Sequence, residues 1–372
     1  MRLDPPFLEP ALPVTRVTPA LHRLEGRDKV TGKARYTDDV RLPGMLWAKA
    51  MRSPHPHARI RRIDIRAAQA LPGVHAVMTA ENAPDIDWYD RSKLFDRTLR
   101  FVGDEVAVVA ADSETIANEA LALIDVEYDL LPFVVALKAA RVSTAPRVHP
   151  DKPGNLLGEP RKEHRGSIRK GMREAELIID RVYATPCVLH NALEAHGSVA
   201  VWVGDRLTLH TSTQGIYAIR AEVASKLGIE ENKVRVLTEH MGGGFGAKQI
   251  AWKQDVIAAL LARQTRRPVR MLLDREAENL AAGNRNATRQ HLRIGATREG
   301  ILTAICADID VQIGAYRAGG EESIVDGIYH TLYACANVRT QQSVVYTNTG
   351  PSIAFRAPGY VEGCFALESA MD

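Results

Sequence analysis

Val234-Arg235-Val236-Leu237 and, shortly after it, Gly242-Gly243-Gly244-Phe245-Gly246 form a short apolar strand that runs into a glycine-rich turn. Residues 247–263 are then apolar at helical spacing, so the segment predicts a strand, a turn and a helix. Glycine has no Cβ, so a ligand can approach the backbone closely, and a helix directly after the turn would point free N–H groups at a phosphate or pyrophosphate. A turn that only allows close packing explains the glycines equally well.

Two familiar phosphate-binding motifs do not describe this turn. Ala247-Lys248-Gln249 stands where a P-loop requires Gly-Lys followed by Ser or Thr. Gln249 also occupies the third glycine position of a dinucleotide-binding fingerprint. The turn is therefore a candidate anion site of another type.

Two further polar segments are candidates for the same site. Thr213-Gln214-Gly215 lies between an expected strand over 206–212 and an expected helix over 216–227. A Gln amide can both donate and accept hydrogen bonds, although this segment could equally be a helix cap. Arg356 lies between apolar residues ahead of a Pro358-Gly359 turn, and burying it without a partner would be costly. It predicts either an internal anion or a buried salt bridge.

Histidines near residue 190 raise the question of a metal. His190, Glu194 and His196 lie close together, but their spacing is not that of an H-E-x-x-H zinc motif. A polar turn that supports a pocket is the better interpretation. The four cysteines form no C-x-x-C pair, which disfavours an iron–sulfur cluster or structural zinc and indicates four reduced thiols.

The 372 residues suffice for two or three domains. We expect an extended strap over 1–20, a first domain over 21–137, a polar linker over 138–170 and a second domain over 171–372. The first domain contains strand-like residues 42–77, a buried strand over 101–110, a helix over 115–122 behind Asp112-Ser113, and a strand over 124–128. Strands are expected in the second domain over 176–185, 198–203, 206–212, 234–237, 268–273 and 301–313, and its helix over 216–227 should end at Gly228.

Charge and hydropathy exclude several classes of partner. The 48 basic and 45 acidic residues leave a net charge of +3, which gives no reason to expect a nucleic acid. No apolar stretch is long enough to span a bilayer, and residues 1–19 do not form a secretory signal. We therefore expect a cytoplasmic protein.

Taken in order, these segments resemble the molybdenum-binding large subunit of the xanthine oxidase family, which includes xanthine dehydrogenases and aldehyde oxidoreductases. The matching segments are 26–39, 52–58 and 101–107 in the first domain, and His190 with Glu194, 212–214, 242–248 and 355–359 in the second. The resemblance implies an α+β protein. An α/β hammerhead domain would be followed by the first half of a molybdenum-cofactor-binding mixed α/β domain.

The resemblance also implies a molybdenum pyranopterin cofactor, molybdopterin itself or its cytosine dinucleotide. The pterin dithiolene would hold the metal, so no side chain of this chain need be a metal ligand. Substrate would lie near Gln249 and Pro358. The residues that match the family's cofactor contacts are Gln214, Gly215, Gly243, Gly244, Phe245, Gly246 and Arg356.

The implied reaction hydroxylates a small molecule with oxygen from water, and a glutamate acts as the general base. No segment here matches that glutamate, so no catalytic residue is assigned. A chain carrying the C-terminal half would supply it, while iron–sulfur and FAD domains would belong to separate subunits. The alternatives are a truncated or scaffold subunit without activity of its own, and a module that only binds phosphate.

The expected substrate is an aldehyde or an N-heterocycle. Xanthine-type members of the family carry a Glu at the position of Gln249, an Arg at the position we align with Ile324, and an aromatic residue at that of Pro358. All three differ here. The resemblance therefore disfavours a purine.

Overall fold

The computed structural model describes residues 23–320 and 323–372. The strap expected over 1–20 lies outside these residues. The chain divides into two compact units, Met1–Arg35 and Tyr36–Asp372. In the described part of the first unit, the short helix α1 (Gly26–Val30) follows an exposed ion pair between Arg23 and Glu25.

The larger unit is built around a seven-stranded mixed sheet in the order β13-β12-β11-β14-β1-β7-β3. The pairs β1–β14 and β12–β13 are parallel, and the other neighbours are antiparallel. The sheet combines strands from both expected domains, because β1 pairs with β14 from Leu46↔Val269 onward. Its strands are β1 (Leu46–Arg52), β3 (Val74–Thr79), β7 (Glu105–Ala111), β11 (Gly197–Val203), β12 (Arg206–Thr211), β13 (Val234–Leu237) and β14 (Val269–Leu272).

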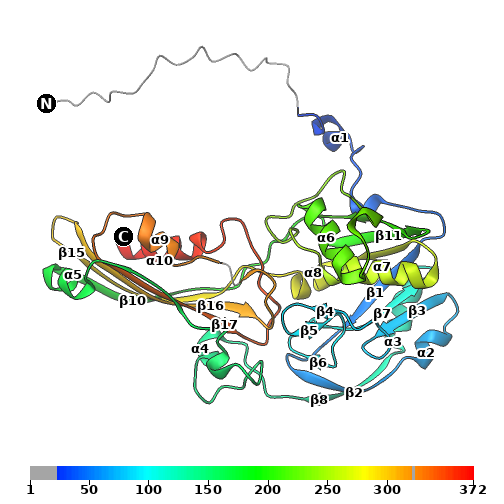
Figure 1. Ribbon diagram of the computed structural model, residues 1–372, viewed down its shortest axis with the longest axis horizontal. Helices are drawn as coiled ribbons and strands as arrows, with labels where there is room; N and C mark the ends of the chain where they lie inside the picture. Colours follow the sequence, from blue (N-terminus) through cyan, green and yellow to red (C-terminus); the bar gives the residue numbers. More distant parts are fainter. Residues whose placement is uncertain (1–22, 321–322) are drawn as a thin grey trace, which may run out of the picture. The chain divides into compact units, whose positions relative to one another are not determined.

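Helices cover both faces of this sheet (Figure 1). On one face, α6 (Ile216–Leu227) and α7 (Lys253–Thr265) pack their apolar residues on the strands. On the other, α2 (Arg66–Ala70) and α3 (Glu114–Ala122) cover β3 and β7. Every residue of β7 is buried as a result, which explains its continuous apolar run.

Two helix boundaries confirm the sequence predictions. Ser113 caps α3, and its side chain accepts a hydrogen bond from Ile116 N. Gly228 ends α6 with φ +64°, a left-handed conformation that costs glycine little. The strand expected over 101–110 begins only at Glu105, because residues 101–104 form a turn.

One helix prediction near the glycine-rich turn is wrong. Helix α7 begins at Lys253 rather than Ala247, and residues 247–252 are irregular. Asp255 fixes the start of the helix, because its carboxylate accepts the Trp252 backbone N–H at 2.7 Å. The first turn of α7 is buried, so its N–H groups do not face a ligand at the glycine-rich turn.

A second sheet has five strands in the order β10-β15-β16-β17-β9. Helices α9 (Gly327–Thr331) and α10 (Tyr360–Met371) pack on one face (Figure 1). All neighbours are antiparallel except β16 and β17. The strands are β9 (Arg161–Arg165), β10 (Leu177–Thr185), β15 (Thr288–Ala296), β16 (Leu302–Gly314) and β17 (Val338–Tyr346).

The stretch expected to be a linker, 138–170, is packed against this unit. It holds most of α4 (Leu137–Ala140), the 3-10 turn η2 (Pro153–Asn155), β9 and the start of α5 (Ile168–Glu174). All of β9 is exposed and only its backbone pairs with β17, so it has no hydrophobic pattern for sequence reasoning to detect. The expected domain boundaries remain predictions.

The remaining elements are short. The described residues contain no helix of the length and hydropathy that crossing a membrane requires. All four cysteines are free thiols. The short elements are β2 (Ala58–Asp64), β6 (Thr98–Leu99) and β8 (Asp125–Leu130) in a three-stranded sheet, the β4 (Asp87–Trp88) and β5 (Ser92–Lys93) pair, α8 (Arg275–Ala281), η1 (Thr37–Asp39) and η3 (Glu231–Lys233).

Candidate functional site

Gln214 is held against the glycine-rich turn by its side-chain oxygen. Gln214 Oε1 accepts hydrogen bonds from Gly246 N at 2.8 Å and from Lys248 N at 3.3 Å. The Gln214 backbone N–H donates to Lys248 O at 2.7 Å. Because two N–H donors fix the oxygen, the amide nitrogen must be the outward atom. Gln214 is exposed, and Nε2 has no hydrogen-bond partner among the residues of 23–320 and 323–372.

The glycines make room for protein groups rather than for empty space. A Cβ at Gly244 would lie 2.5 Å from Gln214 Oε1, and one at Gly242 would lie 2.6 Å from Glu194 Cβ. Gly246 has φ +117°, and its Cβ would lie 2.3 Å from Ala354 O. The close-packing explanation of these glycines is therefore correct. Its effect is to bring Gln214 and the 354–359 segment onto the turn.

Arg356 reaches the same turn through its backbone. Its N–H donates to Phe245 O at 2.7 Å, and its own carbonyl accepts from Arg285 Nη2 at 2.8 Å. The expectation of a buried Arg356 is wrong, because its side chain is exposed and forms no hydrogen bond or ion pair within the described residues. The local Pro358-Gly359 turn lifts it outward, and the buried ion pair belongs instead to Arg285 and Glu362, at 3.2 Å.

Phe355 and His190 line the back of this region. Their rings stack with centroids 4.3 Å apart, and His190 Nε2 donates to Ala354 O at 2.9 Å. Burial lowers the pKa of His190. The ring therefore supports the 354–359 segment, and the described residues contain no cluster of three His, Cys, Asp or Glu side chains that could hold a metal ion.

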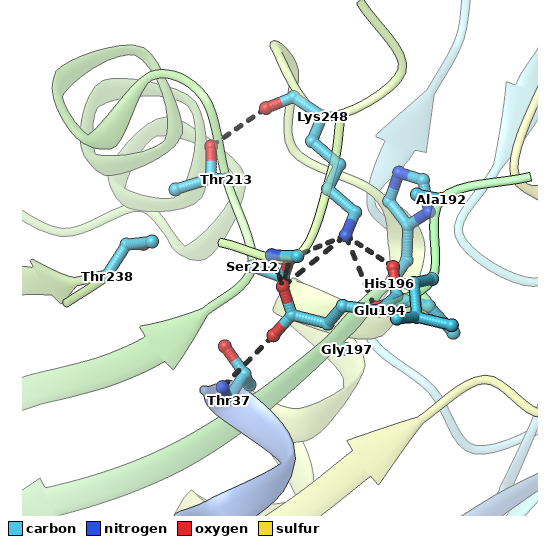
Figure 2. A network of polar contacts seen from close by, with 12 residues as sticks. Thr37, Ala192, Glu194, His196, Gly197, Ser212, Thr213, Thr238 and Lys248 are labelled. Carbon is cyan, nitrogen blue, oxygen red and sulfur yellow. Dashed lines mark hydrogen bonds and ion pairs between the residues drawn. The ribbon is translucent and has the colours of Figure 1, made fainter. Parts of the chain in front are cut away.

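A buried ion pair holds the turn from below (Figure 2). Lys248 Nζ lies 3.7 Å from Glu194 Oε2 and donates to Glu194 O at 2.7 Å and to Ser212 Oγ at 2.6 Å. Glu194 in turn accepts from Gly242 N and Ser212 Oγ, both at 2.7 Å, and from Thr37 N at 3.1 Å. Burial lowers the pKa of Lys248, against the attraction of Glu194. One carboxylate thus joins three segments distant in sequence.

A second pair supports the far end of the turn. His196 Nδ1 lies 2.8 Å from Glu278 Oε1, and its Nε2 faces Ala247 O at 3.2 Å. Burial would raise the pKa of Glu278, but hydrogen bonds from His196 hold it below its usual range. Neither Lys248 nor Glu278 had been assigned a role from sequence patterns. Lys248 and Glu194 stood in the matched motifs, whereas nothing local indicated Glu278.

The expected site residues fall into one connected group with an exposed edge. Gln214, Gly244, Phe245, Gly246 and Arg356 are joined by the contacts above. Two more flank them: Gly243 lies beside the Phe245 ring, and Gly215 starts α6 beside Gln249 O. The two residues expected near substrate, Gln249 and Pro358, are both exposed. An unpaired amide donor and an unpaired guanidinium suit an anionic group rich in acceptor oxygens.

Comparison with known proteins identifies the family. The model of the molybdopterin cofactor-binding domain matches residues 148–372, and the aldehyde oxidase and xanthine dehydrogenase a/b hammerhead domain matches residues 31–132. This confirms the expected fold class, a hammerhead domain followed by a molybdenum-cofactor-binding domain.

Individual relatives agree with the family models. The putative xanthine dehydrogenase molybdenum-binding subunit of Escherichia coli (strain K12) is 33% identical over 94% of this chain and 48% of its own length. The nicotinate dehydrogenase large molybdopterin subunit of Eubacterium barkeri is 31% identical over 94% and 83%. The quinoline 2-oxidoreductase structure from Pseudomonas putida 86 superposes with a TM-score of 0.85 at 30% identity, over 94% and 47%.

Coverage differs among these proteins. The chain spans about half the length of most curated relatives it matches, and 83% of the Eubacterium protein. The match to the cofactor-binding model covers more than half of the chain. The chain therefore belongs to the aldehyde oxidase and xanthine dehydrogenase family of molybdopterin-binding subunits.

Proposed function

We propose that this chain forms one half of the molybdopterin site of an oxidoreductase that hydroxylates an aldehyde or an N-heterocycle with oxygen from water. One observation carries the proposal. Two backbone N–H groups clamp Gln214 Oε1 and so present the amide nitrogen as an exposed donor at the edge of the glycine-rich turn. A donor fixed in this way needs no reorganisation when an acceptor oxygen arrives.

In this proposal, the residues of the chain bind and orient the cofactor. Gln214 Nε2 donates to an oxygen at the metal centre, and the Arg356 guanidinium neutralises negative charge beside it. The main chain of Gly243–Gly246 forms the wall on which the group rests, with Gly215 at its end. When bound, the molybdenum cofactor, as molybdopterin or its cytosine dinucleotide, supplies the redox chemistry.

The substrate class follows from the exposed edge of the site. Gln249 and Pro358 would border the substrate, and neither supplies the negative charge or the aromatic face that the xanthine-type pattern carries there. Among the relatives, the names of the nicotinate and quinoline enzymes refer to N-heterocycles. We therefore keep an aldehyde or N-heterocycle ahead of a purine.

The base glutamate is proposed to lie on a second polypeptide that carries the remainder of the site. Separate iron–sulfur and FAD subunits would accept the electrons in the cytoplasm, a location that the four free thiols favour. An alternative is a scaffold subunit that is inactive alone. It is favoured by the Eubacterium relative, a protein that this chain covers to 83%.

Metal and nucleotide analysis tests the proposal. The chain, expressed with its neighbouring subunits, should contain about one molybdenum per chain and release a pterin. The Gln214→Ala variant should lose most of the molybdenum, whereas Gln264→Ala, an exposed glutamine on α7, should keep it. A module that only binds phosphate would contain no molybdenum and would be insensitive to Gln214.

A further inference from the structure

Helix α10 has an unusual outer face. Its inner residues Gly363, Ala366, Leu367 and Ala370 are buried against the five-stranded sheet. On the opposite side, Tyr360, Val361 and Phe365 are 43%, 49% and 50% exposed. A surface helix normally places charged residues there, and a helix that is apolar all round is normally buried. The described helix thus lacks a covering layer on one side.

Strand β10 continues this apolar surface along the sheet edge. It pairs with β15 alone, so its other edge keeps unpaired backbone groups. Leu177, Ile178 and Val182 are 56%, 51% and 48% exposed. Open edges are usually protected by charges or proline, and the start of this strand, Leu177-Ile178-Ile179, has neither.

A cavity of about 380 Å³ joins the end of β10 to the first turns of α10. Val361 and Phe365 form one wall, and Pro186 and Val188 form another. The buried Arg285–Glu362 pair also lines it. This volume can accept several apolar side chains, and we call these surfaces together the β10–α10 face.

The β10–α10 face is continuous with the proposed cofactor site. Phe355 lines the cavity and also lies 6.5 Å, centroid to centroid, from Phe245. Arg285 stacks on the Phe355 ring at 4.4 Å and bonds to the Arg356 carbonyl. Whatever fills the cavity therefore touches the residues that hold Arg356 in place.

We propose that the β10–α10 face is the docking surface for the polypeptide that corresponds to the uncovered half of the relatives. Most curated relatives are about twice as long as the part this chain matches, so a comparable amount of protein remains to be packed beside it. The face is apolar, partly hollow and adjacent to the site that the remainder must complete. The inference rests on the proposed function.

The partner should therefore present a stripe of apolar side chains, with at least one large residue for the cavity. Burial of a hydrophobic surface of this kind is what distinguishes a permanent subunit contact from an encounter. Filling the cavity also fixes Phe355 and Arg285. Docking should thus hold the 354–359 segment as well as add residues to the site.

Cross-linking provides the test. The chain is expressed with the polypeptide of the same organism that matches the relatives' uncovered half, and Phe365 is replaced by the photo-reactive p-benzoyl-phenylalanine, which keeps an aromatic side chain. We expect a covalent product with that polypeptide upon irradiation. The same replacement at Val203, 75% exposed on β11, should give none.

A charge substitution supplies the second arm. Phe365→Glu should reduce co-purification of the partner about ten-fold or more, and Val203→Glu should leave it unchanged. Cross-links from position 365 to a second copy of this chain, or no cross-links, would overturn the docking surface.

The two proposals fail separately, because the cross-link is scored in cells grown without added molybdate. A cross-linked complex that binds no molybdenum when molybdate is supplied would reject the cofactor site alone. A molybdenum-loaded complex without the cross-link would reject only the β10–α10 face.

Discussion

The side-chain oxygen of Gln214 accepts a hydrogen bond from the backbone nitrogen of Gly246 at 2.8 Å. This bond determines which end of the amide faces outward. Gln214→Glu keeps an acceptor for the clamp but removes the outward donor and adds negative charge. We expect unchanged thermal stability and a loss of turnover of about 10²-fold or more in the assembled enzyme. Steady-state kinetics and a melting curve check this, and wild-type turnover in the variant would show that the donor is unnecessary.

Gly244 tests the position of the same side chain without touching its chemistry. A Cβ here would lie 2.5 Å from Gln214 Oε1, and the backbone of Gly244 is not in the left-handed region. Gly244→Ala should therefore displace the amide and lower the molybdenum content about as much as Gln214→Ala does. Elemental analysis of both proteins provides the comparison. Full metal content in Gly244→Ala alone would mean that the clamped position has no importance.

Gly246 should be far less tolerant of substitution than an ordinary turn glycine. Its φ is +117°, and a Cβ would lie 2.3 Å from Ala354 O. Gly246→Ala should lower the free energy of unfolding by about 3 kcal/mol or more, from strain and overlap together. Gly204 is the matched control, since its φ is +62° and nothing lies within 4 Å of its Cβ, so Gly204→Ala should cost about 1 kcal/mol. Urea titrations measure both, and equal costs would contradict the close approach.

The Lys248–Glu194 pair should stabilise the glycine-rich turn as a unit. The Lys248 side chain is fully buried and that of Glu194 is 10% exposed. Lys248→Met leaves the carboxylate without its cation and should cost about 3 kcal/mol. In the double variant with Glu194→Gln, part of that loss should be recovered, with a coupling free energy of about 1 kcal/mol or more. Strict additivity in this double-mutant cycle would reject the pairing.

Glu105 should make stability depend on acid pH. Burial would raise its pKa, but Lys253 at 2.9 Å and Arg52 at 2.7 Å hold the pKa of Glu105 at about 2, below its ordinary 4.5. Between these values the unfolded chain binds more protons than the folded chain, so the stabilising contribution is complete above pH 4.5 and disappears as the pH falls toward 2. The stability advantage of wild type over Glu105→Gln, measured by urea unfolding, should shrink over this range. An advantage independent of pH would contradict the low pKa.

Local features could be predicted from the sequence because they depend on neighbouring residues. Ser113 at the start of α3 and Gly228 at the end of α6 act within one helical turn, so their positions followed from side-chain and backbone preferences alone. The candidate residues Gln214, Phe245 and Arg356 were found by motif order, and the family model confirms the family to which these motifs belong.

Contacts between distant segments were decided only in the tertiary structure. No pattern in β1 indicates that it pairs with β14, which lies far along the chain, or that β9 continues a sheet within an apparent linker. The outward position of Arg356 and the buried pairing of Arg285 with Glu362 depend in the same way on how three separate segments pack. Hydrogen bonds within one turn are set by the chain itself, whereas strand pairing and the burial of charge depend on which partners the completed fold brings within reach.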